Sequence, residues 1–196
     1  MLSVDLLVSA YSSGWFPMAV GSGDIRWFSP DPRGIIPLDT FHTSRRLARL
    51  VRRGAFRIDI NRNFADVVRA CAAAERETED AGTWIDREIF DSYCALHDAG
   101  YAHSVEAWQD GKLAGGLYGV ALGGAFFGES MFHHVTDASK VALVALVERL
   151  RARGFTLLDT QWTTEHLEQF GALDIPRSQY LKMLGAALQQ DCRFSD

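Results

Sequence analysis

The spacing of hydrophobic residues in the first part of the chain changes at one glycine. Residues 3–13 place apolar side chains at helical intervals behind Ser3, a favoured N-cap residue, and Gly14 ends the pattern. From Phe16 to Pro37 the spacing is interrupted by prolines and glycines, yet the segment is rich in tryptophan and phenylalanine. Because disordered linkers contain few aromatic residues, we expect an aromatic loop that packs over a core or lines a pocket.

Helical spacing returns further along and is broken by short extended or polar stretches. Ser44 can cap a helix that Gly54 ends. The elements expected in this part are a helix over 45–53, a strand over 55–60, a helix from Asn63 to about Ala74, a polar loop over 75–82 and a helix over 85–99.

The hydrophobic period changes to two beyond Ala102. Residues 104–108 alternate, Asp110-Gly111 is typical of a hairpin turn, and residues 113–127 are apolar and rich in glycine. This pattern predicts a meander of antiparallel strands in which the glycines mark bulges or tight turns.

Helices and one more strand complete the pattern. The expected elements are a helix over 137–153, a strand over 156–160, a helix from about Thr164 to Phe170 and a last helix after Pro176. This order predicts an α+β fold in which helices flank a mixed, mainly antiparallel sheet. We expect a small N-terminal α/β subdomain with the aromatic loop, residues 1–40, followed by a larger domain, residues 41–196.

Three polar residues fall where buried strands are expected to end. Glu129 lies in Gly-Glu-Ser-Met-Phe, and Asp159 and Gln161 lie in Leu-Asp-Thr-Gln. Burying a carboxylate without partners is costly. These side chains therefore belong either to a satisfied structural network or to a site that binds or activates a ligand.

Composition narrows the classes of protein. The chain has 196 residues, of which 47% are hydrophobic, enough for a substantial core. Its net charge of -5 means that any contact with nucleic acid requires a local basic patch. The three cysteines lack CxxC spacing, which argues against a disulfide framework or a zinc site. Neither a secretory signal pattern nor an apolar run of membrane-spanning length is present, so we expect a cytoplasmic protein without a membrane partner.

The predicted helix over 45–53 is crowded with arginines and contains no acidic residue. Like charges at helical spacing repel one another, and an anionic partner would relieve that repulsion. Guanidinium groups match phosphate in bidentate geometry. The residues alone leave a solvated helix face and a phosphate-binding surface as equal alternatives. The arginines are Arg45, Arg46, Arg49, Arg52 and Arg53.

Other kinds of chemistry find less support. The order of helices and strands resembles the GNAT-type acyltransferase core, which presents a Gly-rich turn to coenzyme A. The turn from His133 to Lys140 has no glycine and carries Asp137 where a phosphate would approach. His133 and His134 are adjacent, without a His-Glu-x-x-His arrangement, so no metal is expected. Ser130 lacks the second glycine of a hydrolase nucleophile elbow.

Motifs spread over nearly the whole chain resemble the leucyl/phenylalanyl-tRNA–protein transferase family. Each motif is weak alone, but their shared order is specific. They are Ala10-Tyr11, Gly14-Trp15-Phe16-Pro17, Trp27-Phe28-Ser29-Pro30-Asp31-Pro32-Arg33, Phe41-His42, Ser44-Arg45-Arg46, Gly82-Thr83-Trp84-Ile85, Gly100-Tyr101-Ala102-His103-Ser104-Val105-Glu106, Gly115-Gly116-Leu117-Tyr118-Gly119-Val120, Gly128-Glu129-Ser130-Met131-Phe132, Ala138-Ser139-Lys140, Leu158-Asp159-Thr160-Gln161 and Ile175-Pro176-Arg177.

The resemblance implies a GNAT-like acyltransferase that moves Leu or Phe, with Met as a further candidate, from charged tRNA to a protein N-terminus. The expected partners are leucyl-tRNA, phenylalanyl-tRNA, acceptor proteins that begin with Arg or Lys, and the bacterial N-end degradation machinery. Aminoacyl-tRNA is then a co-substrate, and no cofactor or metal is expected. This chain starts almost at the first helix, so we also expect a trimmed N-terminal domain.

The same resemblance implies roles for individual residues. Glu129, Asp159 and Gln161 would surround the acceptor's α-amine and its basic first side chain. As our own hypothesis for the mechanism, we expect Asp159 to polarise the Gln161 carboxamide and Glu129 to anchor the cationic acceptor. The arginine helix would hold the tRNA phosphates. Met18 replaces the tryptophan of many relatives, which gives Trp84 a larger part in holding adenosine. The residues expected to bind the aminoacyl-adenosine end are Trp84, Tyr11, Met18, Leu117, Met131 and Phe132.

Two alternatives stay open on the residues alone. One is a coenzyme A-dependent GNAT acetyltransferase, and the other is a module that binds the end of charged tRNA without catalysis. A transfer assay with charged tRNA and peptides separates the three functions.

Overall fold

A computed structural model describes residues 1–21, 23–74 and 84–195 of the chain. Its helices are α1 (Val4–Ser12), α2 (Arg45–Arg52), α3 (Phe64–Ala73), α4 (Arg87–Asp98), α5 (Ala138–Ala152), α6 (Glu165–Glu168) and α7 (Arg177–Leu188). Its strands are β1 (Phe16–Val20), β2 (Asp24–Phe28), β3 (Arg33–Ile36), β4 (Arg57–Ile60), β5 (Ala102–Gln109), β6 (Lys112–Leu122), β7 (Ala125–His133), β8 (Leu157–Gln161) and β9 (Leu173–Ile175).

Seven strands form one sheet in the order β4-β5-β6-β7-β8-β3-β9, and β1 pairs with β2 in a separate hairpin. All neighbours in the large sheet are antiparallel except β7 and β8, which are parallel. This arrangement confirms the predicted α+β fold with a mixed, mainly antiparallel sheet. A parallel pair requires a crossover connection, and helix α5 supplies it.

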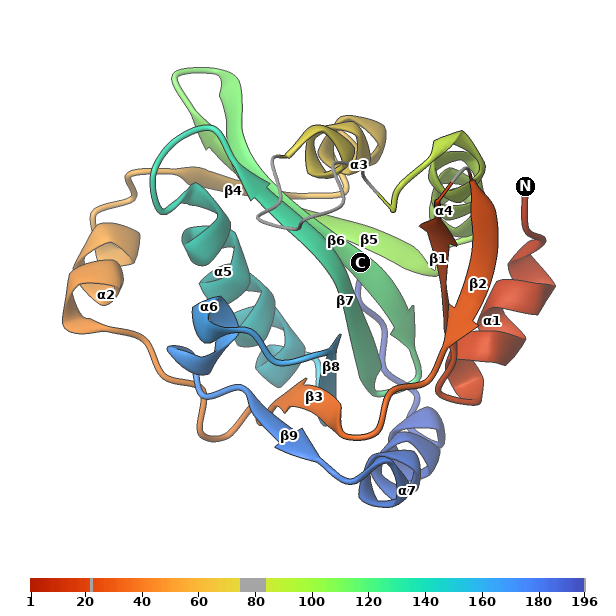
Figure 1. Ribbon diagram of the computed structural model, residues 1–196. Helices are drawn as coiled ribbons and strands as arrows, with labels where there is room; N and C mark the ends of the chain where they lie inside the picture. The colour runs from red at the N-terminus through yellow and green to blue at the C-terminus, as the bar shows by residue number, and fades with distance from the viewer. Residues whose placement is uncertain (22, 75–83, 196) are drawn as a thin grey trace.

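Helices cover both faces of the large sheet, with α2, α5 and α6 on one side and α1, α3 and α4 on the other (Figure 1). Each side has its own hydrophobic core. One core gathers apolar residues of α1, α3, α4 and α7. The other is built mainly from α5, including Leu143, Leu146 and Leu150. The sheet thus separates two packed layers, as an α+β architecture requires.

Local sequence signals account for where several helices begin. The hydroxyls of Ser3, Ser44 and Thr164 accept hydrogen bonds from the backbone N–H three residues onward, and Asp86 caps α4 through its carboxylate in the same way. Each cap satisfies one N–H group that has no partner within its helix.

The aromatic segment between α1 and α2 is not a loop. It forms the β1–β2 hairpin and then β3, which inserts between β8 and β9 in the large sheet. Prolines and glycines within these short strands made them read as a loop in the sequence. Pro17 lies in β1, which pairs only with β2 outside the large sheet, and Gly34 of β3 packs closely on other backbone. A Cβ atom at Gly34 would lie 2.5 Å from the Trp162 carbonyl carbon.

Two other expectations need correction near the C-terminus. Helix α6 spans only four residues, and the three-residue strand β9 follows it.

The polar loop expected over 75–82 lies outside the described residues. Division of the chain at residue 40 stays a prediction. No helix in the described part of the chain is long and apolar enough to cross a membrane.

Candidate active site between strands β7 and β8

Strands β7 and β8 stay paired over only three residues and then separate. Their register runs from Ala125 opposite Leu157 to Phe127 opposite Asp159. Glu129 and Gln161 both follow the last of these pairs, one on each strand. The structure thus brings together the polar residues that the sequence singled out, at a point where the sheet opens.

Glu129 occupies a β-bulge inside β7, not the end of a strand as expected. Tyr118 of β6 lies opposite Ser130, while the next residue, Gly119, lies opposite Gly128, so Glu129 has no partner in the register. A Cβ atom at Gly119 would lie 2.2 Å from the Phe127 carbonyl oxygen, which explains the glycine. Bulges re-aim side chains, and this one directs Glu129 toward the gap between the strands.

Gln161 adopts a rare backbone conformation at the end of β8. Its φ is 67°, in the left-handed region, and the Trp162 N–H donates to the Thr160 carbonyl across it at 2.7 Å. A turn of this kind with positive φ is strained for a residue that has a Cβ atom. The surrounding structure must hold it, and such strain is common at functional sites.

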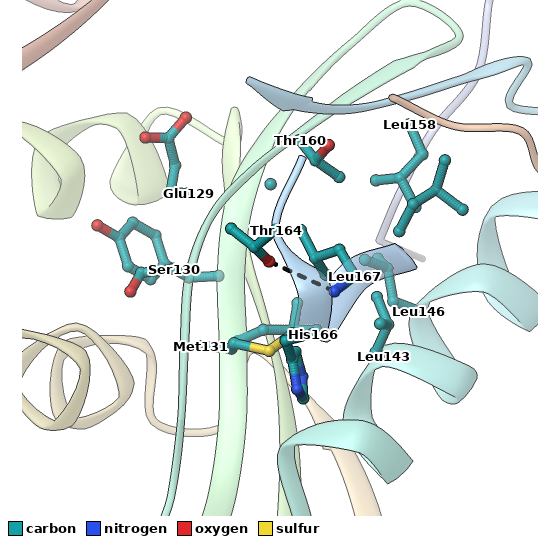
Figure 2. A pocket seen from close by; sticks show the side chains of 14 residues that line it. Glu129, Ser130, Met131, Leu143, Leu146, Leu158, Thr160, Thr164, His166 and Leu167 are labelled. Atoms are coloured by element: carbon teal, nitrogen blue, oxygen red, sulfur yellow. Dashed lines mark hydrogen bonds between the residues drawn. The ribbon is translucent and has the colours of Figure 1, made fainter. Parts of the chain in front are cut away.

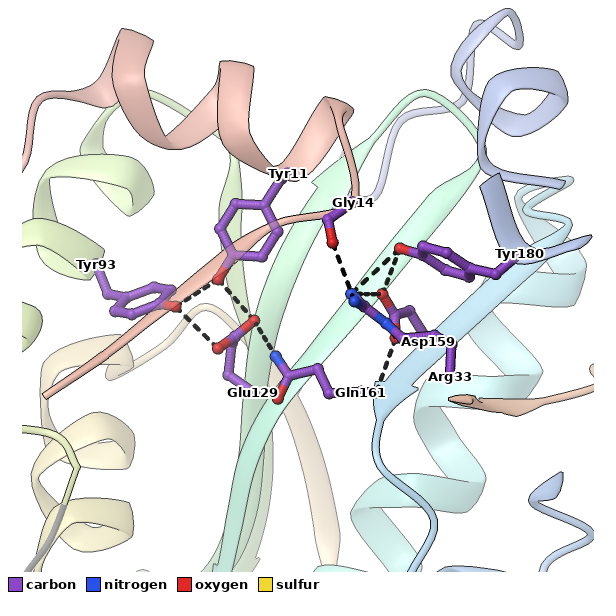
Figure 3. Close-up of polar contacts among 8 residues, drawn as sticks. All are labelled: Tyr11, Gly14, Arg33, Tyr93, Glu129, Asp159, Gln161 and Tyr180. Atoms are coloured by element: carbon purple, nitrogen blue, oxygen red, sulfur yellow. Dashed lines mark hydrogen bonds and ion pairs between the residues drawn. The ribbon is translucent and has the colours of Figure 1, made fainter. Parts of the chain in front are cut away.

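Glu129 accepts hydrogen bonds from three side chains of other elements (Figure 3). Its Oε1 accepts from the Tyr11 hydroxyl at 2.7 Å and from Gln161 Nε2 at 3.0 Å, and its Oε2 accepts from the Tyr93 hydroxyl at 2.8 Å. The two tyrosine hydroxyls also contact each other. Helices α1 and α4 therefore position a residue of β7.

Burial raises the pKa of Glu129 to about 7. The hydrogen bonds from Tyr11, Tyr93 and Gln161 lower it in part, while the charge of Asp159 adds to the rise. Burial also raises the pKa of both tyrosines well above the usual value, so they remain protonated donors. A carboxyl group that titrates near neutral pH can hold a cation or accept its proton.

Asp159 belongs to a second network centred on Arg33. The Arg33 guanidinium donates to Asp159 from Nε at 3.0 Å and from Nη2 at 2.7 Å, and both side chains are fully buried. Arg33 Nη1 donates to the Gly14 carbonyl, and the Tyr180 hydroxyl donates to Asp159 Oδ2 at 2.6 Å (Figure 3). The guanidinium also lies over the rings of Phe16 and Tyr180.

Asp159 contacts the backbone of Gln161, not its carboxamide. Its Oδ1 accepts from the Gln161 N–H at 2.7 Å, whereas the carboxamide faces Glu129. The expectation that Asp159 polarises the Gln161 side chain is therefore wrong. Although burial alone would lower the pKa of Arg33, the hydrogen bonds and charge of Asp159 raise it. Asp159 thus forms an ion pair with Arg33 and holds the backbone of the strained turn at Gln161.

An apolar pocket opens beside Glu129 (Figure 2). Its cavity volume is about 170 Å³. Most of the lining is aliphatic, from β7, β8, α5 and α6, while Glu129 and Ser130 stand at one side. The aliphatic and thioether residues that line it are Ile36, Leu117, Met131, Leu143, Leu146, Leu158 and Leu167.

Comparison with known proteins matches almost the full length of this chain to one protein family. Residues 35–185 match the leucyl/phenylalanyl-tRNA protein transferase family, and residues 1–31 match the N-terminal domain of that family. The chain belongs to this family. A leucyl/phenylalanyl-tRNA–protein transferase of Rhodopseudomonas palustris is 54% identical over 99% of this chain and 86% of its own length. The corresponding protein of Gloeobacter violaceus is 53% identical over 98% of this chain and 97% of its own length.

Solved structures add little to this assignment. L-PGS from Bacillus licheniformis is 15% identical and covers 84% of this chain, which spans 55% of that structure. The TM-score of 0.41 is too low to support an argument about fold or function.

The remaining candidate residues of this family member lie at different distances from the pocket. Leu117 and Met131 line it. Tyr11 is fully buried and reaches the site through its bond to Glu129. Met18 and Trp84 pack against the core on the α1 side, and the Ala19 N–H donates to the Trp84 carbonyl. Phe132 is buried and borders a neighbouring cavity.

All five arginines of this cluster are exposed, four of them within α2 and Arg53 at its C-cap, but they are not equivalent. Arg46 donates to Asp137 through Nη1 at 2.6 Å and Nη2 at 2.8 Å. Asp137, which precedes α5 at its N-cap, therefore faces this arginine. The other four arginines form no ion pair with any residue in the described ranges.

Three side chains of the site were missed from the sequence. Arg33, Tyr93 and Tyr180 hold Asp159 or Glu129, yet all three lie far from them along the chain. Arg33 falls in a motif shared with the family, but nothing in the motif indicated its partner. Among the described residues, no three His, Cys, Asp or Glu side chains gather as a metal site would require.

Proposed function

We propose that the protein transfers Leu or Phe from aminoacyl-tRNA to the α-amine of acceptor proteins. Membership of the transferase family supports this reaction. The observation that connects this reaction to the site is the apolar pocket of about 170 Å³ lined in part by Glu129, which Gln161 contacts. A dry cavity of about 150 Å³ holds a benzene-sized group. The pocket is therefore suited to a leucine or phenylalanine side chain.

The donor side chain would occupy the pocket between Leu117, Met131 and the leucines of α5. Discrimination against other side chains would follow from size, at about 1–3 kcal/mol. The Thr160 hydroxyl borders the pocket and has no hydrogen-bond partner among the described residues. It is a candidate partner for the donor's own amino group. Met18, Tyr11 and Trp84 remain candidates for holding the adenosine end, together with Phe132.

Glu129 and Gln161 would act on the acceptor. An N-terminal ammonium has a reference pKa of about 8. A carboxylate that titrates near 7 can hold this ammonium and take its surplus proton. Because Gln161 Nε2 donates to Glu129, the Oε1 atom of Gln161 is left to accept a hydrogen bond from the amine. The amine nitrogen forms the peptide bond and gives up one proton, the ester C–O bond to the ribose breaks, and the ribose oxygen takes up that proton.

Asp159 and Arg33 would act through Gln161, as positioning residues. Arg33 holds the Asp159 carboxylate in place, and Asp159 accepts from the Gln161 N–H, so the carboxamide approaches the acceptor from a fixed turn. Positioning of this kind contributes much of the acceleration when the donor ester is already activated. No cofactor is required in this scheme, since the donor ester supplies the free energy.

The finer parts of the proposal concern partners and fold. We propose leucyl-tRNA and phenylalanyl-tRNA as donors, proteins beginning with Arg or Lys as acceptors, and N-end degradation in the cytoplasm as the fate of the product. The β7–α5–β8 crossover within a mainly antiparallel sheet supports a GNAT-like core. The exposed arginines of α2 provide a surface for tRNA phosphates.

One assay tests the function. Purified protein is incubated with radiolabelled leucyl-tRNA and peptides that begin with Lys, Arg, Met, Asp or Ala. We expect label in peptides that begin with Lys or Arg. Binding of charged tRNA without transfer would indicate a tRNA-end-binding module. Acetylation of the peptides in the presence of acetyl-coenzyme A, without transfer of leucine, would indicate the acetyltransferase.

A further inference from the structure

A second cavity adjoins the apolar pocket and differs from it in character. Its volume is about 570 Å³, within the range of about 300–1,000 Å³ that is common for small-molecule sites. The two cavities share Met131 and His166 as lining residues. The second is lined by Ala70, Ala73, Ala74, Met131, Phe132, His133, His134, Ser139 and His166.

Hydrogen-bond donors without partners lie at the start of α5, where Ser139 lines this cavity. Ser139 is 3% exposed and lines it, yet no residue in the described ranges bonds to its hydroxyl. The Ser139 and Lys140 N–H groups lie in the first turn of a fifteen-residue helix, where an N–H group has no acceptor within the helix. No described backbone carbonyl outside the helix accepts from either group. Such donors favour an anion.

The charges around the cavity also favour an anion. Burial lowers the pKa of His166, and Lys140 and His133 lower it further, so these groups disfavour one another's positive charge. The one acidic residue at the start of α5, Asp137, is turned away from capping the helix. Its carboxylate pairs instead with Arg46 of α2 at 2.6 Å and with Lys140 at 3.8 Å. These ion pairs compensate the charge that was expected to oppose a phosphate at this turn.

The cavity reaches from the donor pocket to the start of α5. It meets the pocket at Met131 and His166, and α5 is joined to α2 through Asp137 and Arg46. An RNA chain that runs from an aminoacyl group in the pocket toward α2 must pass the start of α5. We propose that this second cavity binds the phosphodiester that precedes the terminal adenosine of the donor tRNA, through Ser139, the first turn of α5 and the histidines. This inference rests on the proposed function.

Two small donors that differ by this phosphodiester and the cytidine attached to it test the proposal. One is 3′-leucyl-adenosine, and the other is cytidylyl-(3′→5′)-adenosine leucylated at the same 3′ position. The variants are Ser139→Ala, which removes only the hydroxyl, and the double variant His133→Glu/His134→Glu at two exposed positions. Arg193→Glu is a matched control, because it alters the charge by a similar amount at the other end of β6, beside Gly123.

We expect the double variant to raise the KM of the dinucleotide donor by about tenfold or more, since two carboxylates replace imidazole groups that can donate hydrogen bonds beside the phosphate. Ser139→Ala should raise it in the same direction. The KM of leucyl-adenosine should change less than about twofold, a difference near the error of such comparisons. Arg193→Glu should change the KM of neither donor. Equal increases for both donors, or no increase for the dinucleotide in well-folded variants, would overturn the proposal.

Direct binding keeps this test separate from that of the transferase reaction. If the unmodified protein transfers leucine from neither donor, the proposed function has failed. Affinity for the uncharged dinucleotide cytidylyl-(3′→5′)-adenosine, measured against adenosine by calorimetry, then decides the cavity alone. Tighter binding of the dinucleotide that is lost in Ser139→Ala supports a phosphate site, and equal binding of both compounds overturns it.

Discussion

The side-chain amide of Gln161 donates a 3.0 Å hydrogen bond to Glu129 Oε1 across the gap where β7 and β8 separate. Glu129 sits at a bulge and Gln161 at a left-handed turn, so neither side chain follows the regular direction of its strand. The bond couples the ionisation of one residue to the orientation of the other. A charged Glu129 accepts from the amide nitrogen and leaves the amide oxygen directed elsewhere.

Replacing Glu129 with Gln should change how stability depends on pH. The folded pKa is about 7 and the ordinary value is 4.5, so between these pH values the unfolded chain releases a proton that the folded chain retains. Wild-type stability therefore falls as pH rises through this interval. We expect the variant to gain stability relative to wild type as pH rises from about 4.5 to about 7 in urea unfolding.

Glu148→Gln is the control for this comparison, because Glu148 is an exposed carboxylate of α5. Its difference from wild type should stay constant with pH. A constant difference for Glu129→Gln as well would show that Glu129 ionises normally in the folded protein.

Removing the Tyr93 hydroxyl should shift the pH dependence of transfer. Its hydrogen bond to Glu129 lowers the pKa of that carboxyl, so Tyr93→Phe should raise this pKa. If transfer requires ionised Glu129, the rising limb of kcat/KM against pH should move to higher pH. Tyr101→Phe, at a half-exposed tyrosine away from the site, should leave the limb in place. If the rising limb of kcat/KM against pH were unchanged in Tyr93→Phe, ionisation of Glu129 would not control the rate of transfer.

The sequence predicted most of the long elements because their hydrophobic spacing and caps agree. Helix α5 and the β5–β6 hairpin lie where the periods of 3.6 and 2 placed them. Strands β3 and β9 were missed since each has only three or four residues, too few to show a period. Their pairing is decided by partners distant in sequence, and Gly34 tolerates the close backbone of Trp162.

The candidate site was predicted in part for a similar reason. Glu129, Asp159 and Gln161 stood out as polar residues among apolar ones, and the structure brings them together. Their partners could not be read from spacing. Arg33 is 126 positions from Asp159, and Tyr11 is 118 positions from Glu129. Only the folded arrangement shows that Asp159 forms an ion pair with Arg33.

Breaking the Arg33–Asp159 pair should strongly destabilise the protein. Both side chains are fully buried, so Arg33→Met leaves Asp159 without its counter-charge. We expect a loss of about 3–5 kcal/mol in the free energy of unfolding. Arg57→Met removes an arginine that is 59% exposed and paired with Asp59, and it should cost about 0–1 kcal/mol. Similar losses for both variants in urea unfolding would contradict the importance of the buried pair.

Enlarging the donor pocket should change the choice of amino acid. Leu146 lines the pocket, so Leu146→Ala makes room beyond a leucine side chain. We expect kcat/KM for phenylalanyl-tRNA to rise relative to leucyl-tRNA by roughly tenfold. Leu150 lies one turn further along α5, is equally buried and does not line the pocket. Leu150→Ala should cost a similar ~2–5 kcal/mol of stability and leave the ratio unchanged. Equal ratios in both variants would place the donor side chain elsewhere.

The arginine helix should contribute to the affinity for whole tRNA and not to chemistry on its end. Arg49 is exposed on α2 without an ion pair to any described residue, so it is available to a phosphate. Arg49→Glu should raise the KM for leucyl-tRNA and reduce the salt dependence of binding by about one unit of slope, as expected for one lost phosphate contact. The KM for 3′-leucyl-adenosine should not change, because that donor carries no phosphate.

Arg87→Glu provides the comparison for this last prediction. Arg87 is 93% exposed on α4, on the other face of the sheet, and its reversal changes the charge of the protein by the same amount. If both variants raise the KM for leucyl-tRNA equally, then overall charge governs association and α2 has no special part. If only Arg49→Glu does so, the tRNA body lies over α2, on the side of the sheet where Asp137 and Arg46 join α2 to α5.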